Sequence, residues 1–267
     1  MNEYQLLKQV YFKPQSGFNP DSSNQAQIES LGPRLRQLRR AGVLGADVVW
    51  MLLRFSKLLI NKDDISPIFQ GRSFTRHKSF AVSLQTFRED PDTAALLDER
   101  YLSERPYDLE ALRQLPAGTL GHEFAGHMLA YKLEIVFYPP LEQTENGDIA
   151  YLRKRARQTH DIHHVVLGFP AIDSGEMAIS AFYLAQHNVP LSALLIGFGF
   201  LYAILREPER IEELMNAIQL GWQIGKRARK LMGVRWEDYW ETPIDDVRRL
   251  LGVPIPLGTF PAGRASQ

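Results

Sequence analysis

The chain has 267 residues, enough for one large domain or two small ones, and 45% of them are hydrophobic, so a core of ordinary size can form. Its 31 basic and 31 acidic side chains give a formal net charge of zero, which argues against nucleic acid as a partner. There is no cysteine, so disulfides, a thiolate nucleophile and cysteine-ligated metals are excluded, and any metal must be held by His, Asp and Glu.

The N-terminal part predicts a loose arm followed by helices. Residues 1–30 are polar and rich in turn-forming residues. The first twenty residues have neither the apolar segment of a signal peptide nor the arginines of a transit peptide, so we expect a cytoplasmic protein. A short basic helix is predicted over 31–40, and an amphipathic one over 46–60. Segment 71–88 has mixed periodicity and stays ambiguous.

Three helices are predicted next, over 92–101, 108–115 and 120–133, with Asp108 and Thr119 as the N-caps of the last two. The third contains the stretch GHEFAGH. Its second histidine follows the first by five residues, whereas the zinc-protease pattern needs four, so we reject that interpretation. His122 and His127 remain candidates for the surroundings of a site or for a substrate wall, although core or surface roles are more common.

The stretch 151–176, YLRKRARQTHDIHHVVLGFPAIDSGE, holds three of the seven histidines. On a helical wheel His164 lies about 40° and Asp161 about 100° from His160, so the three share one side of a helix. Two histidines four residues apart with an acid between them can bind a divalent metal. Gly168 and Pro170 then end the helix, and Glu176 can return from the next helix as a fourth ligand.

Less specific interpretations of the same residues stay open. Histidine pairs on helices are often surface residues, and Glu176 could serve only in a capping box with Asp173 as N-cap. A cap at Asp173 and a metal ligand at Glu176 are compatible, because the cap leaves the rest of the helix free. The donor set suits Zn, Mn, Fe or Mg, of which we expect Zn first.

Two arginines share the face of the presumed ligands, with Arg153 at about 20° and Arg157 at about 60° on the wheel. An arginine fork suits a carboxylate or phosphate, so metal and arginines together indicate an anionic substrate, with Arg153 and Arg157 as candidate catalytic residues. A solvated basic face is the alternative, and we expect Lys154 and Arg155 to belong to one.

The C-terminal half predicts three more helices after the one that follows Glu176. The apolar stretch 189–205 is interrupted by proline and glycines, and we expect a buried helix rather than a membrane span. Pro208 should open a long helix that Gly233 ends, and a last short one covers 245–251. The predicted buried side of the long helix consists of Ile211, Leu214, Ile218, Trp222 and Leu231. Two glycines, Gly221 and Gly225, allow close packing. The basic end suits a membrane surface and consists of Lys226, Arg227, Arg229 and Lys230.

No strand alternation, repeat or linker interrupts this pattern. The sequence therefore predicts an all-α protein, a single-domain multi-helix bundle over residues 1–267.

These motifs resemble the ubiquinone (coenzyme Q) biosynthesis family known as the fourth component of that pathway's complex. The carriers are HDIHHVVLGFPAIDSGE, which matches the family's H-D-x-x-H-(x11)-E signature, the stretch ERPYDLEALRQLPAGTLG, the Y-x3-R-x-R-x2-H-D lead-in at Tyr151, and the small apolar helix after Pro190. The resemblance covers roughly residues 85–205.

The resemblance implies an all-helical protein with His160, Asp161, His164 and Glu176 as ligands of a divalent metal. It also implies peripheral membrane association, a homodimer, and other quinone-biosynthesis proteins as partners. Two roles follow from it. One is the replacement of the C1 carboxyl of a polyprenylated aromatic precursor by hydroxyl, an oxidative decarboxylation. The other is a non-catalytic scaffold that binds an isoprenoid lipid. A helical HD-type phosphohydrolase is a third, less favoured interpretation, suggested by His160 and Asp161 alone.

Overall fold

The structure is a computed structural model, which describes residues 78–103, 106–133, 135 and 147–256. All of them belong to the compact unit Gln70–Gln267. The arm predicted for 1–30 and the helices predicted for 31–40 and 46–60 lie outside the described residues. The single-domain organisation of 1–267 therefore stays a prediction.

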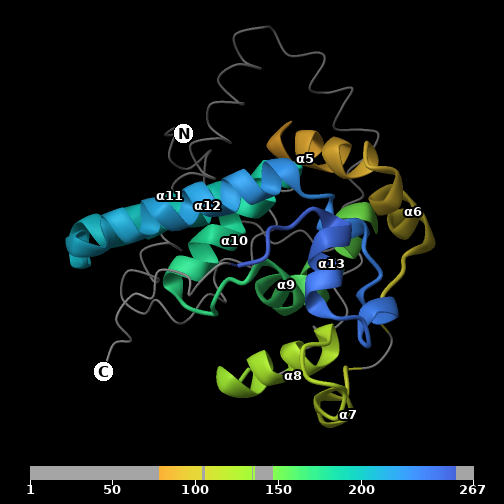
Figure 1. The fold of residues 1–267 in the computed structure, drawn as a ribbon. Coiled ribbons are helices and arrows are strands. Elements are labelled where there is room, and N and C mark those ends of the chain that lie inside the picture. The colour runs from red at the N-terminus through yellow and green to blue at the C-terminus, as the bar shows by residue number, and fades with distance from the viewer. Residues whose placement is uncertain (1–77, 104–105, 134, 136–146, 257–267) are drawn as a thin grey trace, which may run out of the picture. The chain divides into compact units, whose positions relative to one another are not determined.

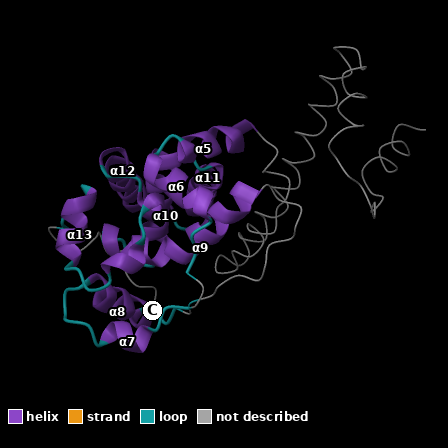
Figure 2. Cartoon of the chain, turned by 90° about the vertical axis from the view of Figure 1, so that its right-hand side faces the viewer, coloured by secondary structure: helices purple, strands orange, loops and turns teal. Residues whose placement is uncertain are grey.

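Within the described ranges the fold is entirely helical, which confirms the all-α class for this part of the chain (Figure 2). Its sole β-type contact is an isolated bridge between Thr119 and Pro243. Short 3-10 turns cover Pro208–Arg210, Leu231–Gly233 and Trp236–Tyr239. The α-helices are α5 (Lys78–Arg88), α6 (Pro91–Glu99), α7 (Leu109–Arg113), α8 (Leu120–Ala130), α9 (Gly147–Leu167), α10 (Asp173–His187), α11 (Pro190–Arg206), α12 (Ile211–Arg227) and α13 (Ile244–Leu251).

Local signals in the sequence set several helix ends as expected. The side chain of Asp108 accepts a hydrogen bond from the backbone N–H of Ala111 at the start of α7, and Thr119 caps α8 in the same way. Gly168 follows the last residue of α9 with a φ of +73°, a left-handed conformation that glycine adopts at little cost. These predicted caps are confirmed.

Three other predicted helix boundaries are wrong. Ile172 is the N-cap of α10, and Asp173 is its first residue and pairs with Arg210 at 2.9 Å. Pro208 begins a 3-10 turn, so α12 starts only at Ile211. This helix ends at Arg227, well before Gly233.

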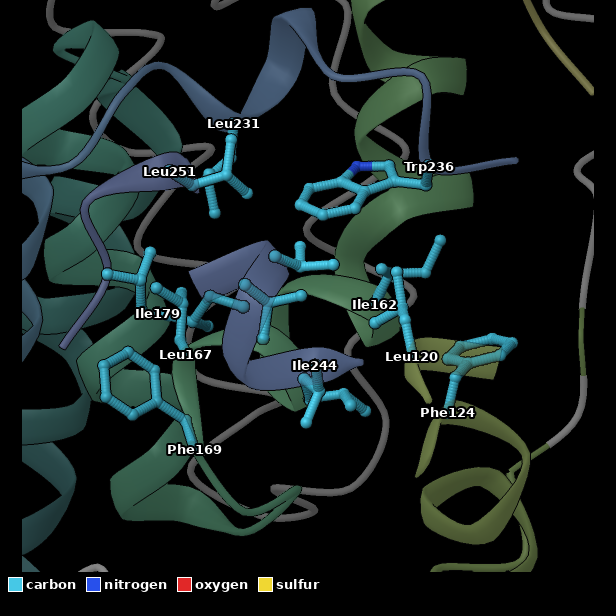
Figure 3. Packing of buried hydrophobic residues seen from close by; sticks show 14 of the residues in the cluster. Leu120, Phe124, Ile162, Leu167, Phe169, Ile179, Leu231, Trp236, Ile244 and Leu251 are labelled. Carbon is cyan, nitrogen blue, oxygen red and sulfur yellow. The ribbon is translucent and has the colours of Figure 1, made fainter. Parts of the chain in front are cut away.

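The main core lies where α8, α9, α10, α12 and α13 meet the segment between α12 and α13 (Figure 3). Phe124 of α8, Ile162 of α9 and Phe182 of α10 are almost fully buried in it. Trp236, from the segment after α12, is also completely buried. Burying such side chains stabilises the fold by about 1.5–3 kcal/mol each. Residues of α8, α10 and α13 share this core with those of α9, so packing fixes the position of α9.

Helices α10 and α12 pack along each other at very short range (Figure 1). A Cβ atom on Gly221 would lie 1.9 Å from the carbonyl oxygen of Ala178, and one on Gly225 would lie 2.8 Å from that of Phe182. The predicted role of these two glycines in close packing is confirmed.

Helix α11 is less buried than predicted. Only Ser192 and Ala203 are buried along its length, whereas Leu201, Ile204 and Leu205 are 44%, 60% and 59% exposed. Trp222 of α12, predicted on the buried side, is 43% exposed. None of the helices described is long and apolar enough to cross a bilayer, in agreement with the rejection of a membrane span.

Candidate metal centre

Three of the predicted ligands converge between α9 and α10. His160 and His164 lie one turn apart on α9, and Glu176 lies in the first turn of α10. The Nε2 atoms of the two histidines are 3.1 Å apart. Glu176 places Oε2 3.3 Å from Nε2 of His160 and Oε1 3.1 Å from Nε2 of His164. In the described part of the chain these residues form the one group of His, Asp and Glu side chains able to hold an ion.

These separations fit a metal ion. Nitrogen and oxygen ligands bind divalent ions such as Zn²⁺ at about 2.0–2.2 Å, which puts neighbouring donors about 2.8–3.6 Å apart in octahedral or tetrahedral coordination. The three measured separations fall within that range. Two imidazoles and a carboxylate are also the donor types that Zn, Mn and Fe accept. The site therefore has the composition and the dimensions of a divalent-metal centre.

The turn between the two helices depends on Gly175. A Cβ atom there would lie 1.8 Å from the carbonyl oxygen of Pro170, so only glycine lets α10 begin this close to the loop. Gly168 reverses the chain after α9, and Glu176 directly follows Gly175 in α10. The small residues between the histidines and Glu176 thus bring the carboxylate back to them.

His164 is held by its other ring nitrogen. Its Nδ1 lies 3.1 Å from the carbonyl oxygen of Phe169, an acceptor, so Nδ1 carries the proton and Nε2 is left to bind a metal. The end of α9 is fixed from α13, because Arg248 donates to the carbonyl oxygens of Val165 and Val166 at 3.0 and 2.9 Å. These carbonyls have no partner within the helix itself.

The electrostatics favour a charged carboxylate. Burial alone would raise the pKa of Glu176, but the charges and hydrogen bonds of His160 and His164 outweigh it and hold that pKa well below its usual range. Burial lowers the pKa of His160, and the carboxylate of Glu176 outweighs burial, so the net pKa is raised. Glu176 is therefore an anion at neutral pH and ready to bind a cation.

The centre is open on one side. The side chain of Glu176 is 51% exposed and that of His160 is 24% exposed, whereas His164 is completely buried. A closed structural site surrounds its ion with protein, while a catalytic site keeps a position accessible. The observed exposure is that of an accessible site.

The other predicted site residues lie around this group. Asp161 is half-buried on α9 and is not among the three converging side chains, so its role as a ligand stays a prediction. Arg157 is near enough for its charge to act on His160. Arg153 lies one turn earlier on α9 and is half-buried. The role of these two arginines towards a substrate is likewise still a prediction.

The expectation that Arg155 is solvated is wrong. It is completely buried, donates to the carbonyl oxygen of Val234 at 2.5 Å, and lies over the ring of Tyr101 at 5.3 Å. Its nearest charged partner is Glu237 at 3.5 Å. Arg155 therefore ties α9 to the segment after α12 rather than contributing to a basic surface.

The two histidines of α8 have different positions. The ring of His127 lies nearly parallel to that of His164, with centroids 5.9 Å apart. Burial, together with the charge of His164, lowers the pKa of His127 to about 4, so it is neutral at pH 7. His122 instead contacts Arg113 and the carbonyl of Leu115. Of the two, only His127 borders the centre.

Tyr183 and His163 neighbour the candidate ligands and had no function assigned from the sequence. Tyr183 lies on the same face of α10 as Glu176, seven residues later, and its hydroxyl is 2.7 Å from Nδ1 of His163 and 3.5 Å from Nδ1 of His160. Burial raises the pKa of Tyr183 well above its ordinary value, so it keeps its proton. The spacing of Glu176 and Tyr183 was the one available signal for this contact.

Residues 72–256 match the family described as coenzyme Q (ubiquinone) biosynthesis protein Coq4. This match includes the whole centre and extends beyond both ends of the resemblance seen in the sequence. The chain belongs to the Coq4 family.

Members of the Coq4 family from distant organisms are similar to this chain. The mitochondrial ubiquinone biosynthesis protein COQ4 of Eremothecium gossypii is 35% identical over 180 residues, which cover 67% of this chain and 52% of that protein. The human mitochondrial COQ4 homolog is 28% identical over 185 residues, 68% of each chain. The chain thus spans about half to two thirds of the length of such curated relatives.

A solved structure of a protein described as a ubiquinone biosynthesis protein, from Nostoc punctiforme, has the same fold. It superimposes with a TM-score of 0.67 at 32% sequence identity, and the match covers 77% of this chain and 97% of that one. The eukaryotic relatives are mitochondrial by name, and the cytoplasmic location expected for this chain stays a prediction.

Proposed function

We propose that this Coq4-family protein binds a divalent metal through His160, Asp161, His164 and Glu176 and uses it to convert a polyprenylated hydroxybenzoate to the phenol at C1. The observation that supports this most is the convergence of two imidazoles and a carboxylate at metal-ligand separations. Family membership supports a place in ubiquinone biosynthesis. Zn is the ion we expect first, with Mn, Fe and Mg as alternatives.

The proposed reaction is an oxidative decarboxylation. The bond from C1 to the carboxyl carbon breaks, that carbon leaves as CO₂, and a C–O bond forms at C1 with oxygen from dioxygen. Overall, the acid and half a molecule of dioxygen give the phenol and CO₂. When bound, the metal acts as a Lewis acid that polarises oxygen atoms near it.

The protein's own residues orient the substrate. Arg157 lies close to the centre, and Arg153 shares its helix face, so their guanidinium groups can hold the carboxylate. The apolar residues of α11, such as Leu201 and Ile204, can cover the isoprenoid tail, at about 0.8 kcal/mol per buried CH₂ group. The exposure of Glu176 leaves room for a substrate at the ion.

Metal content tests the first step. Elemental analysis of the wild type should give about one divalent ion per chain, as expected for a single centre, and His164→Ala should lose it. His122→Ala is the matched control, since that histidine contacts Arg113 away from the centre and should not affect the metal. Equal metal in wild type and His164→Ala would refute the assignment.

Turnover tests the second step. Metal-loaded protein is given prenylated 4-hydroxybenzoate labelled at the carboxyl carbon, with oxygen, and CO₂ release is followed. Glu176→Ala and Arg157→Ala should lose activity while folding normally. A truncated substrate without the prenyl tail should react poorly if the apolar helices bind the tail.

A non-catalytic scaffold is the second candidate, favoured by the exposed apolar residues of α11. In that role the protein would present an isoprenoid lipid to other quinone-biosynthesis proteins as a homodimer on the membrane surface. No turnover by the wild type, with co-purified lipid in organic extracts, would support it. An HD-type phosphohydrolase is less well supported, because its pattern needs a further histidine upstream and a further aspartate downstream of the dyad, whereas His160 converges with His164 and Glu176.

A further inference from the structure

A partly buried tyrosine, Tyr183 of α10, lies between two histidines of α9. The Tyr183 hydroxyl is 2.7 Å from Nδ1 of His163 and 3.5 Å from Nδ1 of His160. His163 is completely buried, and its ring meets that of Trp236 at 64° with centroids 5.4 Å apart. Since a hydroxyl has one proton, it can donate to only one of the two nitrogens and must accept from the other.

The metal site decides between the two directions. His160 turns Nε2 towards His164 and Glu176, so metal binding needs the lone pair of Nε2. A neutral imidazole then carries its proton on Nδ1, which faces Tyr183. The Tyr183 hydroxyl then accepts a hydrogen bond from Nδ1–H of His160. It donates its own hydrogen bond to Nδ1 of His163, the shorter of the two contacts. His163 in turn must carry its proton on Nε2.

We propose that Tyr183 and His163 are positioning residues that hold His160 in the tautomer and ring orientation that leave Nε2 free for the metal. This inference rests on the proposed metal function. It assigns a role to His163, the one histidine of the HDIHH stretch that does not face the ion, and to a hydroxyl on the same helix as Glu176.

The opposite direction would have a different consequence. If His163 donated from Nδ1, Tyr183 would donate to Nδ1 of His160, and the proton of a neutral His160 would lie on Nε2. That proton faces Glu176 and would have to leave before a metal could bind. The tautomer of His163 therefore reports the direction of both hydrogen bonds of Tyr183. It can be measured without any assay of activity.

Metal affinity tests the role of Tyr183. The Tyr183→Phe variant removes one oxygen and keeps the ring, and its affinity for Zn²⁺, measured by competition with a chromophoric chelator, should fall about 10–100-fold, the usual effect of losing a partner of a metal-binding histidine. The matched control is Tyr151→Phe. Tyr151 is a buried tyrosine of α9 whose hydroxyl donates to the carbonyl of Tyr101 at 3.0 Å, and its variant should bind Zn²⁺ like the wild type.

A double-mutant cycle tests whether His163 acts through Tyr183. His163→Leu should weaken Zn²⁺ binding, and the double variant should bind no more weakly than Tyr183→Phe alone. Additive losses would show that His163 affects the site by another route. That result would contradict the proposed relay, the hydrogen bonds that run from His160 through Tyr183 to His163. Thermal melts of the metal-free variants identify any that are unfolded and thus keep loss of fold separate from loss of affinity.

Nitrogen-15 NMR of the histidine rings gives a second readout. In the zinc-loaded protein we expect His160 protonated on Nδ1 and His163 on Nε2. A proton on Nδ1 of His163, or equal Zn²⁺ affinity in Tyr183→Phe and wild type, would overturn the relay while leaving the metal centre intact. A wild type that binds no Zn²⁺, Mn²⁺ or Fe²⁺ would overturn the metal proposal and this inference together.

Discussion

At the scale of single residues, His187 shows how burial governs charge. It is completely buried, stacks on Phe87 at 3.9 Å, and neither ring nitrogen has a hydrogen-bond partner in the described part of the chain. Burial, with a smaller effect from the charge of Lys230, lowers its pKa to about 3. The unfolded chain therefore takes up this proton near pH 6.5, and the folded chain only near pH 3.

This shift predicts a pH-dependent loss of stability. Because the unfolded state binds this proton first, His187 contributes a fall in the free energy of unfolding as the pH drops from about 6.5 towards 3, of about 2 kcal/mol between pH 7.5 and pH 5. His187→Leu should remove that contribution and leave the one from His127, whose pKa burial also lowers. Urea denaturation of both proteins at the two pH values measures it. Phe87→Leu is the control, since it alters the same packing without removing the ionisable group and should keep the wild-type slope.

The proposed metal ligands predict a second effect at the scale of single residues. Protons compete with the ion for the imidazoles, and Glu176 raises the pKa of His160 in the metal-free protein. Apparent Zn²⁺ affinity should therefore decrease as the pH falls through that raised pKa. In Glu176→Gln the carboxylate charge is absent, so binding should be weaker overall and its pH midpoint should lie lower. An unchanged midpoint would show that Glu176 does not set the protonation of His160.

At the scale of helices, two glycines should respond oppositely to alanine. Gly175→Ala places a Cβ atom 1.8 Å from the carbonyl oxygen of Pro170. This oxygen belongs to the backbone, so no side-chain rotation can relieve the clash. We expect a loss of about 1–3 kcal/mol or more and weaker metal binding, because the clash moves Glu176. Gly197→Ala in α11 meets nothing within 4 Å and should be neutral or gain up to about 1 kcal/mol from helix propensity. Thermal melts and metal titrations compare the two, and a harmless Gly175→Ala would contradict the turn geometry.

At the scale of the whole molecule, α11 presents an exposed apolar face. Leu201, Ile204 and Leu205 follow one another at helical spacing, and the basic residues Lys226 and Arg227 end the neighbouring α12. Such an apolar face suits the surface of a bilayer, whereas Lys226 and Arg227 lie at the far end of α12 from the residues that follow α11 and would meet anionic lipid there. Since no described helix could span the membrane, we predict that carbonate or high salt releases the protein from membranes.

A charge on this face should weaken the association. Leu205→Glu is expected to reduce co-sedimentation with anionic vesicles. Leu129→Glu on α8 is the matched control, because both leucines are 59% exposed and both variants add one negative charge. Equal loss in the two variants would show a general charge effect instead of a binding face, and retention of the wild type after carbonate would argue against peripheral attachment.

The sequence by itself determined the features that depend on a few neighbouring residues. The caps at Asp108 and Thr119, the end of α9 at Gly168 and the spacing of His160 and His164 are of this kind. Each results from hydrogen bonds or backbone preferences within about one helical turn, so the composition of a short stretch is sufficient to predict it.

Only the tertiary structure decided which faces are buried. Arg155 is buried because Val234, 79 residues later, supplies an acceptor, and α11 and Trp222 are exposed because no described helix covers them. The relay from His160 through Tyr183 to His163 likewise needs α9 and α10 at a fixed distance. That distance is set by packing at Gly175 and along the core, where residues far apart in the chain meet, and periodicity within one helix carries no information about such partners.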